Sequence, residues 1–361
     1  MGSDGSAGGG ATPWDITSAL DWPIETAGKR GRRIEGAEQL ARSARLGIDT
    51  AAWQVRAELR ARLLDLAAAR ARAEQLGREE AAHREVVGLL EQRVRAGAAS
   101  AAEAAPARIA GFQSAADLAE AERQSREARL RVAEAIGVTP RALEGVELVF
   151  PLDAPPAGAE PTSDELRRQA LQERPEILAS LAEYEASQSA LQLEIARQYP
   201  DLRVGPGYEY DQGLNKWAVV GISIELPVLN RNQGPIAEAE ARRAEAAARF
   251  LALQASVIGE LERALANRES AREALARSAS ALAAERDRLR ATQQALEAGA
   301  VDRLALDAAQ LELARAERIH LDAQVRMQQA IGDLEAAVQQ PLDEGGAALQ
   351  GRSVAPGTGA P

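Results

Sequence analysis

The sequence repeats itself at a fixed offset of 202 residues. Gly97 in Ala96-Gly97-Ala98 matches Gly299 in Ala298-Gly299-Ala300, and each glycine ends an Ala/Arg/Glu/Leu-rich tract that opens near Ile34 or Ile236. Because 299 − 97 equals 236 − 34, the two copies align without a gap. Other identical pairs at this offset are Glu38 and Glu240, Val55 and Val257, Leu59 and Leu261, and Arg84 and Arg286. The chain is therefore expected to contain two copies of one supersecondary unit.

Each copy begins with a segment of different character. Apolar and polar residues alternate over Trp14–Trp22, which ends at Pro23, and over Trp217–Leu226, which ends at Pro227. Alternation of this kind is typical of a half-buried strand. A further strand over Leu202–Tyr210 would form a hairpin with Trp217–Leu226, with Gly213 in the turn.

Long helical patterns follow both strand segments. The tracts 34–95 and 236–297 are nearly unbroken, and 62 residues at about 1.5 Å each would reach roughly 93 Å. Gly97 and Gly299 break them, and helices are expected to return over 100–136 and 301–340. A turn is expected over Glu25–Arg33, and a helix pair over 164–198, broken before Pro175 and capped by Ser163. The expected regions are 1–13 flexible, 14–137 first repeat, 138–200 connector and equatorial helices, 201–340 second repeat, and 341–361 disordered tail.

Composition excludes several classes of protein. Aromatic residues make up only 3% of the 361 residues, and the apolar fraction is mostly alanine, which suits closely packed helices better than one large core. The formal charge of −11 argues against a nucleic-acid-binding surface, because binding to phosphates needs a basic face. The sequence contains no cysteine, which excludes disulfides and thiolate chemistry, and no run of 18 or more apolar residues that predicts a transmembrane helix.

No constellation of residues predicts catalysis. The only histidines, His83 and His320, do not correspond at the repeat offset, so we expect them to be surface helix residues rather than metal ligands. No nucleophile motif or Gly-rich phosphate loop is present. We therefore expect no catalytic, metal or cofactor site, and no enzyme activity.

Several short motifs, in their order and spacing, resemble the TolC-like outer membrane factor family (outer membrane efflux proteins), and within it the heavy-metal efflux (CzcC-like) branch. Together they extend from residue 14 to about residue 342. The motifs are Gly28-Lys29-Arg30-Gly31, Glu173-Arg174-Pro175-Glu176, Tyr199-Pro200-Asp201-Leu202, Ile224-Glu225-Leu226-Pro227-Val228, Gly299-Ala300-Val301-Asp302-Arg303-Leu304 and Ala330-Ile331-Gly332-Asp333-Leu334-Glu335.

The resemblance implies a mainly α fold with a few β-strands: long antiparallel coiled-coil hairpins in two repeats, and strands that contribute to a trimeric outer-membrane β-barrel. It implies an exit duct of a tripartite efflux system that conducts its cargo, with heavy-metal cations as a candidate, across the periplasm and outer membrane of a Gram-negative bacterium. Its implied partners are two further copies of the chain, a periplasmic adaptor (membrane fusion) protein, an inner-membrane pump and outer membrane lipid. A lone hairpin cannot close a barrel, so strands that meet lipid require oligomerisation.

The chain departs from the family at its start. Family members carry a helical segment and a strand before the position of Trp14, whereas only a short Gly/Ser/Ala stretch without a signal-peptide pattern precedes it here. We expect N-terminal truncation or, alternatively, a degenerate member.

The resemblance also assigns candidate sites, each of which has a simpler alternative. The adaptor-contacting tips could instead be plain helix caps. The carboxylates of the pore constriction could instead be ordinary solvated side chains. The residues of the membrane face could instead pack in a core or a turn. The tips comprise Val94, Gly97, Ser100, Leu296, Gly299 and Val301; the constriction comprises Asp302 and Asp307; the membrane face comprises Ile16, Leu20, Val204, Tyr208, Val220, Ile222 and Ile224.

One other class of protein shares much of this composition. A soluble periplasmic coiled-coil adaptor or scaffold would also contain long Ala-rich hairpins. It would not need the alternating strands of residues 201–227, so this hairpin favours the duct.

Overall fold

A computed structural model describes residues 15–153, 161–211, 214–224 and 230–342. For residues 15–16, 210–211 and 214–221 only the backbone is described. Trp14, the expected flexible start and most of the expected tail lie outside the described residues.

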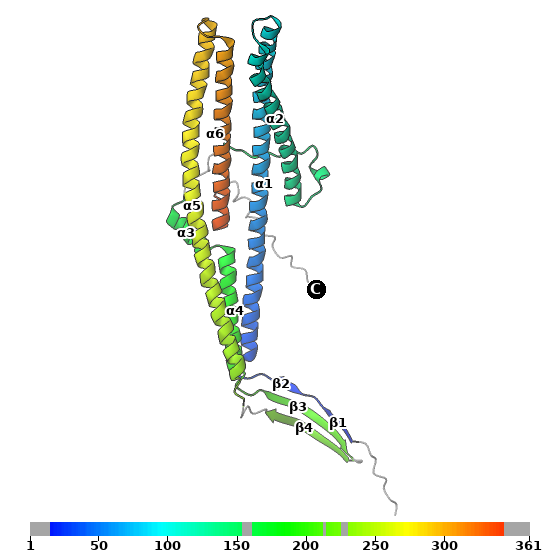
Figure 1. Cartoon of the computed structure of the whole chain (residues 1–361). Coiled ribbons are helices and arrows are strands. Elements are labelled where there is room, and N and C mark those ends of the chain that lie inside the picture. Colours follow the sequence, from blue (N-terminus) through cyan, green and yellow to red (C-terminus); the bar gives the residue numbers. More distant parts are fainter. Residues whose placement is uncertain (1–14, 154–160, 212–213, 225–229, 343–361) are drawn as a thin grey trace, which may run out of the picture. The chain divides into compact units, whose positions relative to one another are not determined.

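Within these ranges the chain is mainly helical with a few strands, which confirms the predicted fold class (Figure 1). The elements are β1 (Asp15–Ala19), β2 (Trp22–Ile24), α1 (Lys29–Arg95), α2 (Ala101–Ile136), η1 (Pro140–Leu143), α3 (Ser163–Gln172), α4 (Pro175–Ala196), β3 (Leu202–Asp211), β4 (Leu214–Ile224), α5 (Gln233–Glu297) and α6 (Arg303–Val338).

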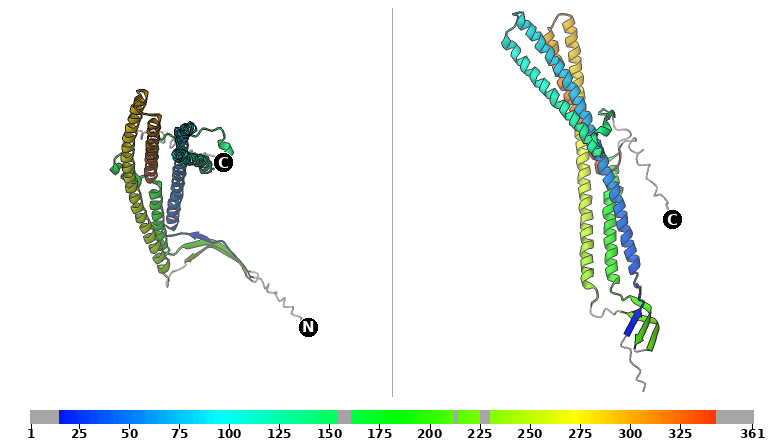
Figure 2. Two further views of the ribbon diagram at one scale, coloured as in Figure 1. Left: turned by 45° about the horizontal axis from the view of Figure 1, so that its top comes forward. Right: turned by 90° about the vertical axis from the view of Figure 1, so that its right-hand side faces the viewer.

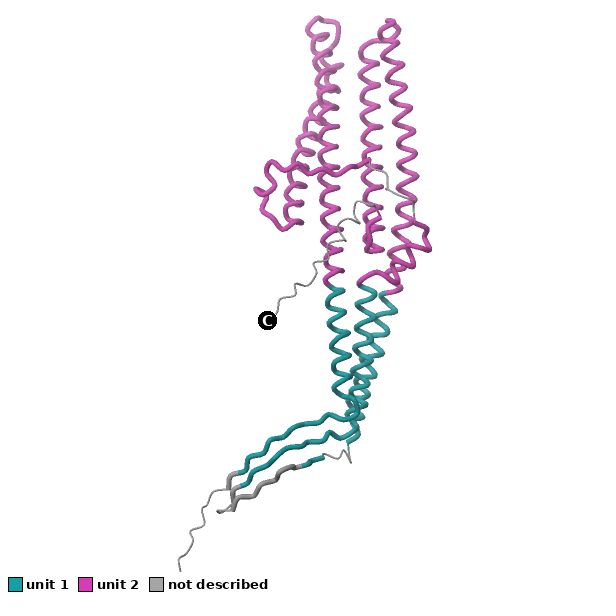
Figure 3. Tube along the Cα trace, turned by 180° about the vertical axis from the view of Figure 1, so that it is seen from behind, with its two compact units in different colours: residues 1–47, 176–253 teal, residues 48–175, 254–361 magenta. Residues whose placement is uncertain are grey.

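The chain divides into two compact units (Figure 3). Unit 1 comprises residues 1–47 and 176–253 and contains the sheet, α4 and the first parts of α1 and α5. Unit 2 comprises residues 48–175 and 254–361 and contains α2, α3, α6 and the remainder of α1 and α5. This division runs through both sequence repeats, so the expected repeat boundaries stay a prediction.

Three expected helix starts were wrong, and one of them is that of α5, which begins at Gln233 rather than near Ile236. Helix α1 begins at Lys29, so most of the expected turn over Glu25–Arg33 is helical. The turn is completed earlier, because Ala27 (φ 56°) and Gly28 (φ 75°) both adopt left-handed backbone angles. Helix α3 is capped by Thr162 rather than Ser163: the Thr162 hydroxyl accepts from the Glu165 N–H, and the Glu165 side chain accepts from the Thr162 N–H.

The sheet is antiparallel and centred on β3. Strands β1 and β2 both pair with β3, and β4 pairs with its other edge. The single strand expected over Trp14–Trp22 is therefore two strands, and Pro23 lies within the second of them. The interruption occurs where the Leu20 carbonyl lies against Gly205, so closely that an added Cβ on Gly205 would be 1.7 Å from the oxygen.

Small and branched apolar side chains form the core of unit 2, in which two helix hairpins, α1–α2 and α5–α6, can be followed in Figures 1 and 2. Between α1 and α2, Leu66 packs with Ala128 and Val132. Between α1 and α6, Leu64 packs with Leu321 and Val325, and between α5 and α6, Ala271 packs with Met327 and Ile331. Alanine at many contacts allows these helices to approach closely without aromatic side chains.

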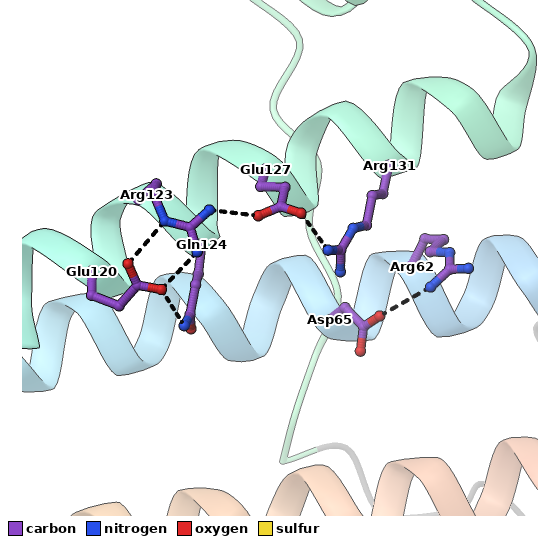
Figure 4. Close-up of polar contacts among 7 residues, drawn as sticks. All are labelled: Arg62, Asp65, Glu120, Arg123, Gln124, Glu127 and Arg131. Carbon is purple, nitrogen blue, oxygen red and sulfur yellow. Dashed lines mark hydrogen bonds and ion pairs between the residues drawn. The ribbon is translucent and has the colours of Figure 1, made fainter.

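The outer faces of the same helices carry paired charges. Along α2, Arg123 bonds both Glu120 and Glu127, and Glu127 also pairs with Arg131 (Figure 4). Hydrogen bonds from Arg123 and Gln124 lower the pKa of Glu120 to about 2. Spacings of three and four residues place these side chains on one helix face, which explains how a long helix with a narrow apolar stripe stays helical.

Two buried charges account for two of the sequence motifs. Arg174 of the Glu-Arg-Pro-Glu motif donates to the Glu260 carboxylate and to the Ala337 carbonyl, both at 3.0 Å. Glu335, which ends the Ala330–Glu335 motif, lies 3.3 Å from Arg60 and accepts from the Leu342 N–H at 3.1 Å. These motif residues therefore join α1, α5 and the turn after α3 to the end of α6.

Candidate functional site

The two hairpin tips have the same backbone geometry. Gly97 (φ 68°) donates to the Val94 carbonyl at 3.0 Å, and Ala98 donates to the Arg93 carbonyl at 2.8 Å. Gly299 (φ 69°) and Ala300 repeat these bonds to Leu296 and Ala295 at 3.0 and 2.8 Å. This is a Schellman cap in both copies, and it uses glycine because the position needs a left-handed backbone. The offset seen in the sequence thus corresponds to one turn structure used twice.

The returning helices are capped at equivalent positions as well. Ser100 accepts from the Glu103 N–H at 3.2 Å, and Asp302 accepts from the Ala305 N–H at 2.9 Å. Gly97, Ser100 and Gly299 are exposed, whereas Val94, Leu296 and Val301 are half-buried beside them. An added Cβ at either glycine would meet nothing within 4 Å. Each tip is therefore an open turn with apolar side chains at its flanks.

A cavity of about 420 Å³ lies between the first tip and the start of α6. The two candidate constriction residues, Asp302 and Asp307, both line it, but they differ in exposure. Asp302 is exposed and its carboxylate is already engaged as the helix cap, whereas Asp307 is 3% exposed. The lining comprises Val86, Leu89, Leu90, Gln92, Arg93, Ala96, Ala98, Asp302, Arg303, Leu304 and Asp307.

Asp307 is buried against a neighbouring helix of the same chain. One carboxylate oxygen lies 3.3 Å from the Arg303 guanidinium, which also pairs with Glu85 of α1, and the other oxygen has no hydrogen-bond partner among the described residues. Burial raises the pKa of Asp307, and nearby Glu85 raises it further, although Arg303 opposes the change. In this conformation Asp302, rather than Asp307, is the accessible carboxylate.

The raised pKa gives a stability prediction. A carboxyl whose pKa is higher in the folded protein than its ordinary 3.8 destabilises the fold when ionised, so this cost is present at neutral pH and disappears below about pH 3.8. We expect Asp307→Asn to raise the thermal unfolding temperature at neutral pH and to leave it unchanged near pH 3. The control is Asp302→Asn, which keeps a good helix cap and removes only the smallest of the contributions that raise the pKa of Asp307, so it should change the unfolding temperature much less at neutral pH. A lower unfolding temperature for Asp307→Asn at neutral pH would contradict the prediction.

The candidate membrane face falls into cross-strand rows on β2, β3 and β4. Trp22 pairs with Val204 and Val204 with Ile222, while Ile24 pairs with Leu202 and Leu202 with Ile224. Residues paired directly across strands lie on one face of a sheet. Leu20 is 62% exposed, Trp22 68% and Ile222 69%, and Val204 and Tyr208 are half-buried.

The alternation on β4 is not continuous. Its register with β3 shifts between Gly205 and Gly207, so that Val219 and Val220 both lie opposite Pro206. The assignment of Val220 to the face of Ile222 therefore stays a prediction, since its side chain lies outside the described residues. The same holds for the side chain of Ile16 on β1.

A buried lysine joins α1 to the start of β3 within unit 1. The Lys29 ammonium donates to the Tyr199 carbonyl and to the Asp201 carboxylate, both at 2.7 Å. The Thr26 N–H also donates to Asp201, at 2.9 Å. These bonds lower the pKa of Asp201. Two motifs noted in the sequence, Gly28–Gly31 and Tyr199–Leu202, thus contact each other, although nothing in their spacing indicated the pairing.

The two histidines were expected to be surface helix residues, but they are less exposed than that. Both are partly buried: His83 lies 4.0 Å from Glu79, and His320 shares a hydrogen bond of 3.1 Å with Ser278. Across the described residues, no cluster of three or more histidine or acidic side chains could hold a metal ion. No described helix is both long and apolar enough to cross a bilayer.

Comparisons with known proteins agree with this geometry. The family model "Outer membrane efflux protein" matches residues 1–138 and 166–339. The cobalt-zinc-cadmium resistance protein CzcC of Cupriavidus metallidurans is 30% identical over 243 residues, which are 67% of this chain and 57% of CzcC. The chain thus spans little more than half the length of this relative.

Solved structures share the fold. A membrane protein from Pseudomonas aeruginosa has a TM-score of 0.74 at 19% identity and covers 90% of this chain and 82% of its own. The outer membrane protein VceC of Vibrio cholerae has a TM-score of 0.74 at 18% identity, covering 91% of this chain and 80% of its own.

The chain belongs to the outer membrane efflux protein family. This is a family of transport proteins of the Gram-negative outer membrane rather than of enzymes. The adaptor or scaffold alternative is set aside, because the family model matches both repeats together with the strands.

Proposed function

We propose that the protein is the outer-membrane exit duct of a tripartite efflux system. The observation that carries this proposal is the combination of two identically capped helix hairpins with a sheet that leaves large apolar side chains exposed. Exposed Trp22 and Ile222 are costly in water but suit contact with lipid. The proposal locates the strands in the outer membrane and the helices in the periplasm.

The duct is a homotrimer. Strand β4 occupies one edge of the sheet and β1 with β2 the other, and these outer edges have no further strand partner within the described chain. A sheet in lipid must close on itself because unpaired backbone groups are costly there. Strands from further copies of the chain would close it.

Heavy-metal cations are the proposed cargo. The support is CzcC, a cobalt-zinc-cadmium resistance protein by name and 30% identical to this chain. The exposed Asp302 carboxylates of three copies would place negative charge at the start of α6, and this charge attracts cations. Asp307 would add to this negative charge only if its side chain left its buried position beside Arg303.

The tips are the proposed docking sites for a periplasmic adaptor, which links the duct to an inner-membrane pump. Each tip combines an exposed glycine with half-buried apolar side chains, Val94 in the first copy and Leu296 with Val301 in the second. A glycine turn allows another helix to approach the backbone closely.

Deletion of the gene in its native host tests this function. We expect loss of resistance to cobalt, zinc and cadmium, full recovery with the intact gene, and a trimer in the outer membrane fraction. The cation duct would be rejected if the deletion strain were as sensitive to these cations as the wild type and retained no more of them in its cells. Recovery of the protein only from the soluble periplasm would reject the membrane assignment.

A pair of arginine substitutions tests the membrane face. Ile222→Arg on a lipid-facing row should cost about 2–4 kcal/mol at mid-bilayer and less near the interface, so the amount of membrane trimer should fall. Ser223→Arg on the opposite face, where Arg203 already lies, should have little effect. The measurement is trimer abundance on a semi-native gel of outer membranes. Equal loss or equal tolerance for both variants would show that the faces are misassigned.

A further inference from the structure

The turn after α3 is held at the end of the α5–α6 hairpin. The buried Arg174 guanidinium donates to the Glu260 carboxylate of α5 and to the Ala337 carbonyl of α6, both at 3.0 Å. Helix α3 itself contacts α6. Two apolar side chains next to these acceptors along the helices, Val257 and Val338, are 0% exposed. The second hairpin therefore has a closed site that is filled by α3 and its arginine.

The first hairpin, α1–α2, repeats the residues of this site. At the offset of 202 residues, the residues identical to their counterparts in the second hairpin are Val55, Glu58, Leu59 and Ala135. Ile136 stands where the second hairpin has a valine, and the residue after it has a left-handed backbone in both copies, with φ 78° at position 137 and 52° at position 339. The carboxylate and the carbonyl that accept from the arginine are thus both present a second time.

In the first hairpin these residues are uncovered. Val55 is 57% exposed and Ile136 is 43% exposed. The Glu58 side chain is 59% exposed and lies 3.5 Å from Arg62, one turn along the same helix. An exposed pair of this kind contributes little to stability, so Glu58 can accept from a second cation at small cost.

The uncovered residues lie toward one end of the hairpin. Leu66 of α1 packs with Val132 of α2, and the two helices are antiparallel (Figure 1). Residues that precede Leu66 therefore lie toward the same end as residues that follow Val132. All of them belong to unit 2. The first hairpin thus has the same site as the second, but without a segment in it.

We infer that Val55, Glu58 and Ile136 form an open docking site for a helical segment of a partner polypeptide. The segment has the chemistry of α3 and its turn: a helix with apolar side chains four residues apart, followed by an arginine. Its guanidinium group would donate to the Glu58 carboxylate and to the Ala135 carbonyl, and its apolar side chains would cover Val55 and Ile136.

The partner is a different polypeptide because this sequence has one such arginine to offer. The dipeptide Arg-Pro occurs once in the sequence, and its arginine, Arg174, is already buried against Glu260. The inference goes beyond the proposed transport function and does not depend on it.

A peptide that spans residues 161–198 is the probe, because it contains the segment that fills the equivalent site. Its binding to the purified full chain is measured by fluorescence anisotropy of a labelled peptide. We expect one peptide per chain. Glu58→Gln in the chain, or Arg174→Gln in the peptide, should weaken binding at least about tenfold, since each change removes a hydrogen-bonded charge. Both changes together should weaken it little more than either alone.

The matched control is Glu74→Gln. Glu74 is also exposed on α1 and pairs with an arginine one turn along, Arg78, so this change removes the same kind of local pair at another place on the helix. The affinity for the peptide should stay unchanged. Absence of binding to the wild-type chain, or equal binding by the Glu58→Gln and Glu74→Gln variants, would overturn the docking site.

Cysteine labelling shows where the peptide binds, because the chain has no cysteine of its own. A maleimide should react more slowly with Ile136→Cys when the peptide is bound, and at an unchanged rate with Ile319→Cys, an exposed position on α6. Slow labelling of Ile136→Cys without the peptide would show that a second copy of the chain already covers the site. That result would overturn the partner polypeptide.

Discussion

Replacing Gly97 and Gly299 together with valine is expected to abolish cation resistance while leaving the membrane trimer in place. Both glycines have positive φ, which a β-branched residue adopts only at a cost of about 1–3 kcal/mol each. An added Cβ meets no atom of the chain at either position, so no packing inside the protomer is lost. The added bulk would instead face an approaching adaptor. The measurements are cation resistance in a strain with this gene as the only exit duct, and trimer abundance on a gel.

Two further variants separate backbone strain from loss of the docking surface. Gly137→Val with Gly145→Val places the same residue at positive φ (78° and 77°), again in open space but away from the tips, and it should keep resistance. Gly97→Asn with Gly299→Asn should relieve the strain, because asparagine tolerates this backbone region, yet still crowd the tip. Normal resistance of the double valine variant would remove the tips from the mechanism.

Features that depend on residues close together in the chain could be predicted from the sequence. The two long helices, their ends at Arg95 and Glu297 and their glycine breaks all follow from local propensity and from capping chemistry. The repeat strengthened these assignments, since the same pattern occurred twice. The start of α1 was missed because Gly28, Gly31 and four cations resemble a turn, whereas only Gly28 is part of it.

Features that depend on contacts between distant residues could not be predicted. The burial of Asp307 results from α1 lying beside α6, and the spacing of Arg303 and Asp307 indicates only a local ion pair. The contact of Lys29 with Asp201 joins residues 172 positions apart. The two motifs were visible as similarities to a family, but their physical reason, a buried ammonium group with two oxygen acceptors, required the fold.

The break between β1 and β2 is another feature that depends on a contact between distant residues. Local alternation predicts one strand over Trp14–Trp22, and nothing in that segment marks a break. The break is caused by Gly205, some 185 residues later, whose missing side chain admits the Leu20 carbonyl. The Leu20 N–H then donates to the Pro206 carbonyl at 3.0 Å, which holds the interrupted segment beside β3.

Gly205→Ala is therefore expected to prevent the first strands from pairing with β3. The added methyl group would lie 1.7 Å from the Leu20 oxygen and 2.7 Å from its carbonyl carbon, far inside contact distance. These are backbone atoms held by strand pairs on both sides, Ala19 with Gly207 and Trp22 with Val204, so neither can move without breaking the sheet. Loss of these pairs would leave β3 with an open edge, which is costly in lipid.

The measurement is the yield of trimer in the outer membrane and the protease sensitivity of the chain. We expect a severe loss of trimer for Gly205→Ala, with degradation of the unassembled protein. The control is Gly47→Ala, in unit 1 on α1, where an added Cβ meets nothing within 4 Å and alanine favours the helix. Wild-type trimer yield for Gly205→Ala would mean that Leu20 does not approach β3 in the assembled protein, and the pairing of β1 and β2 with β3 would then need to be reassigned.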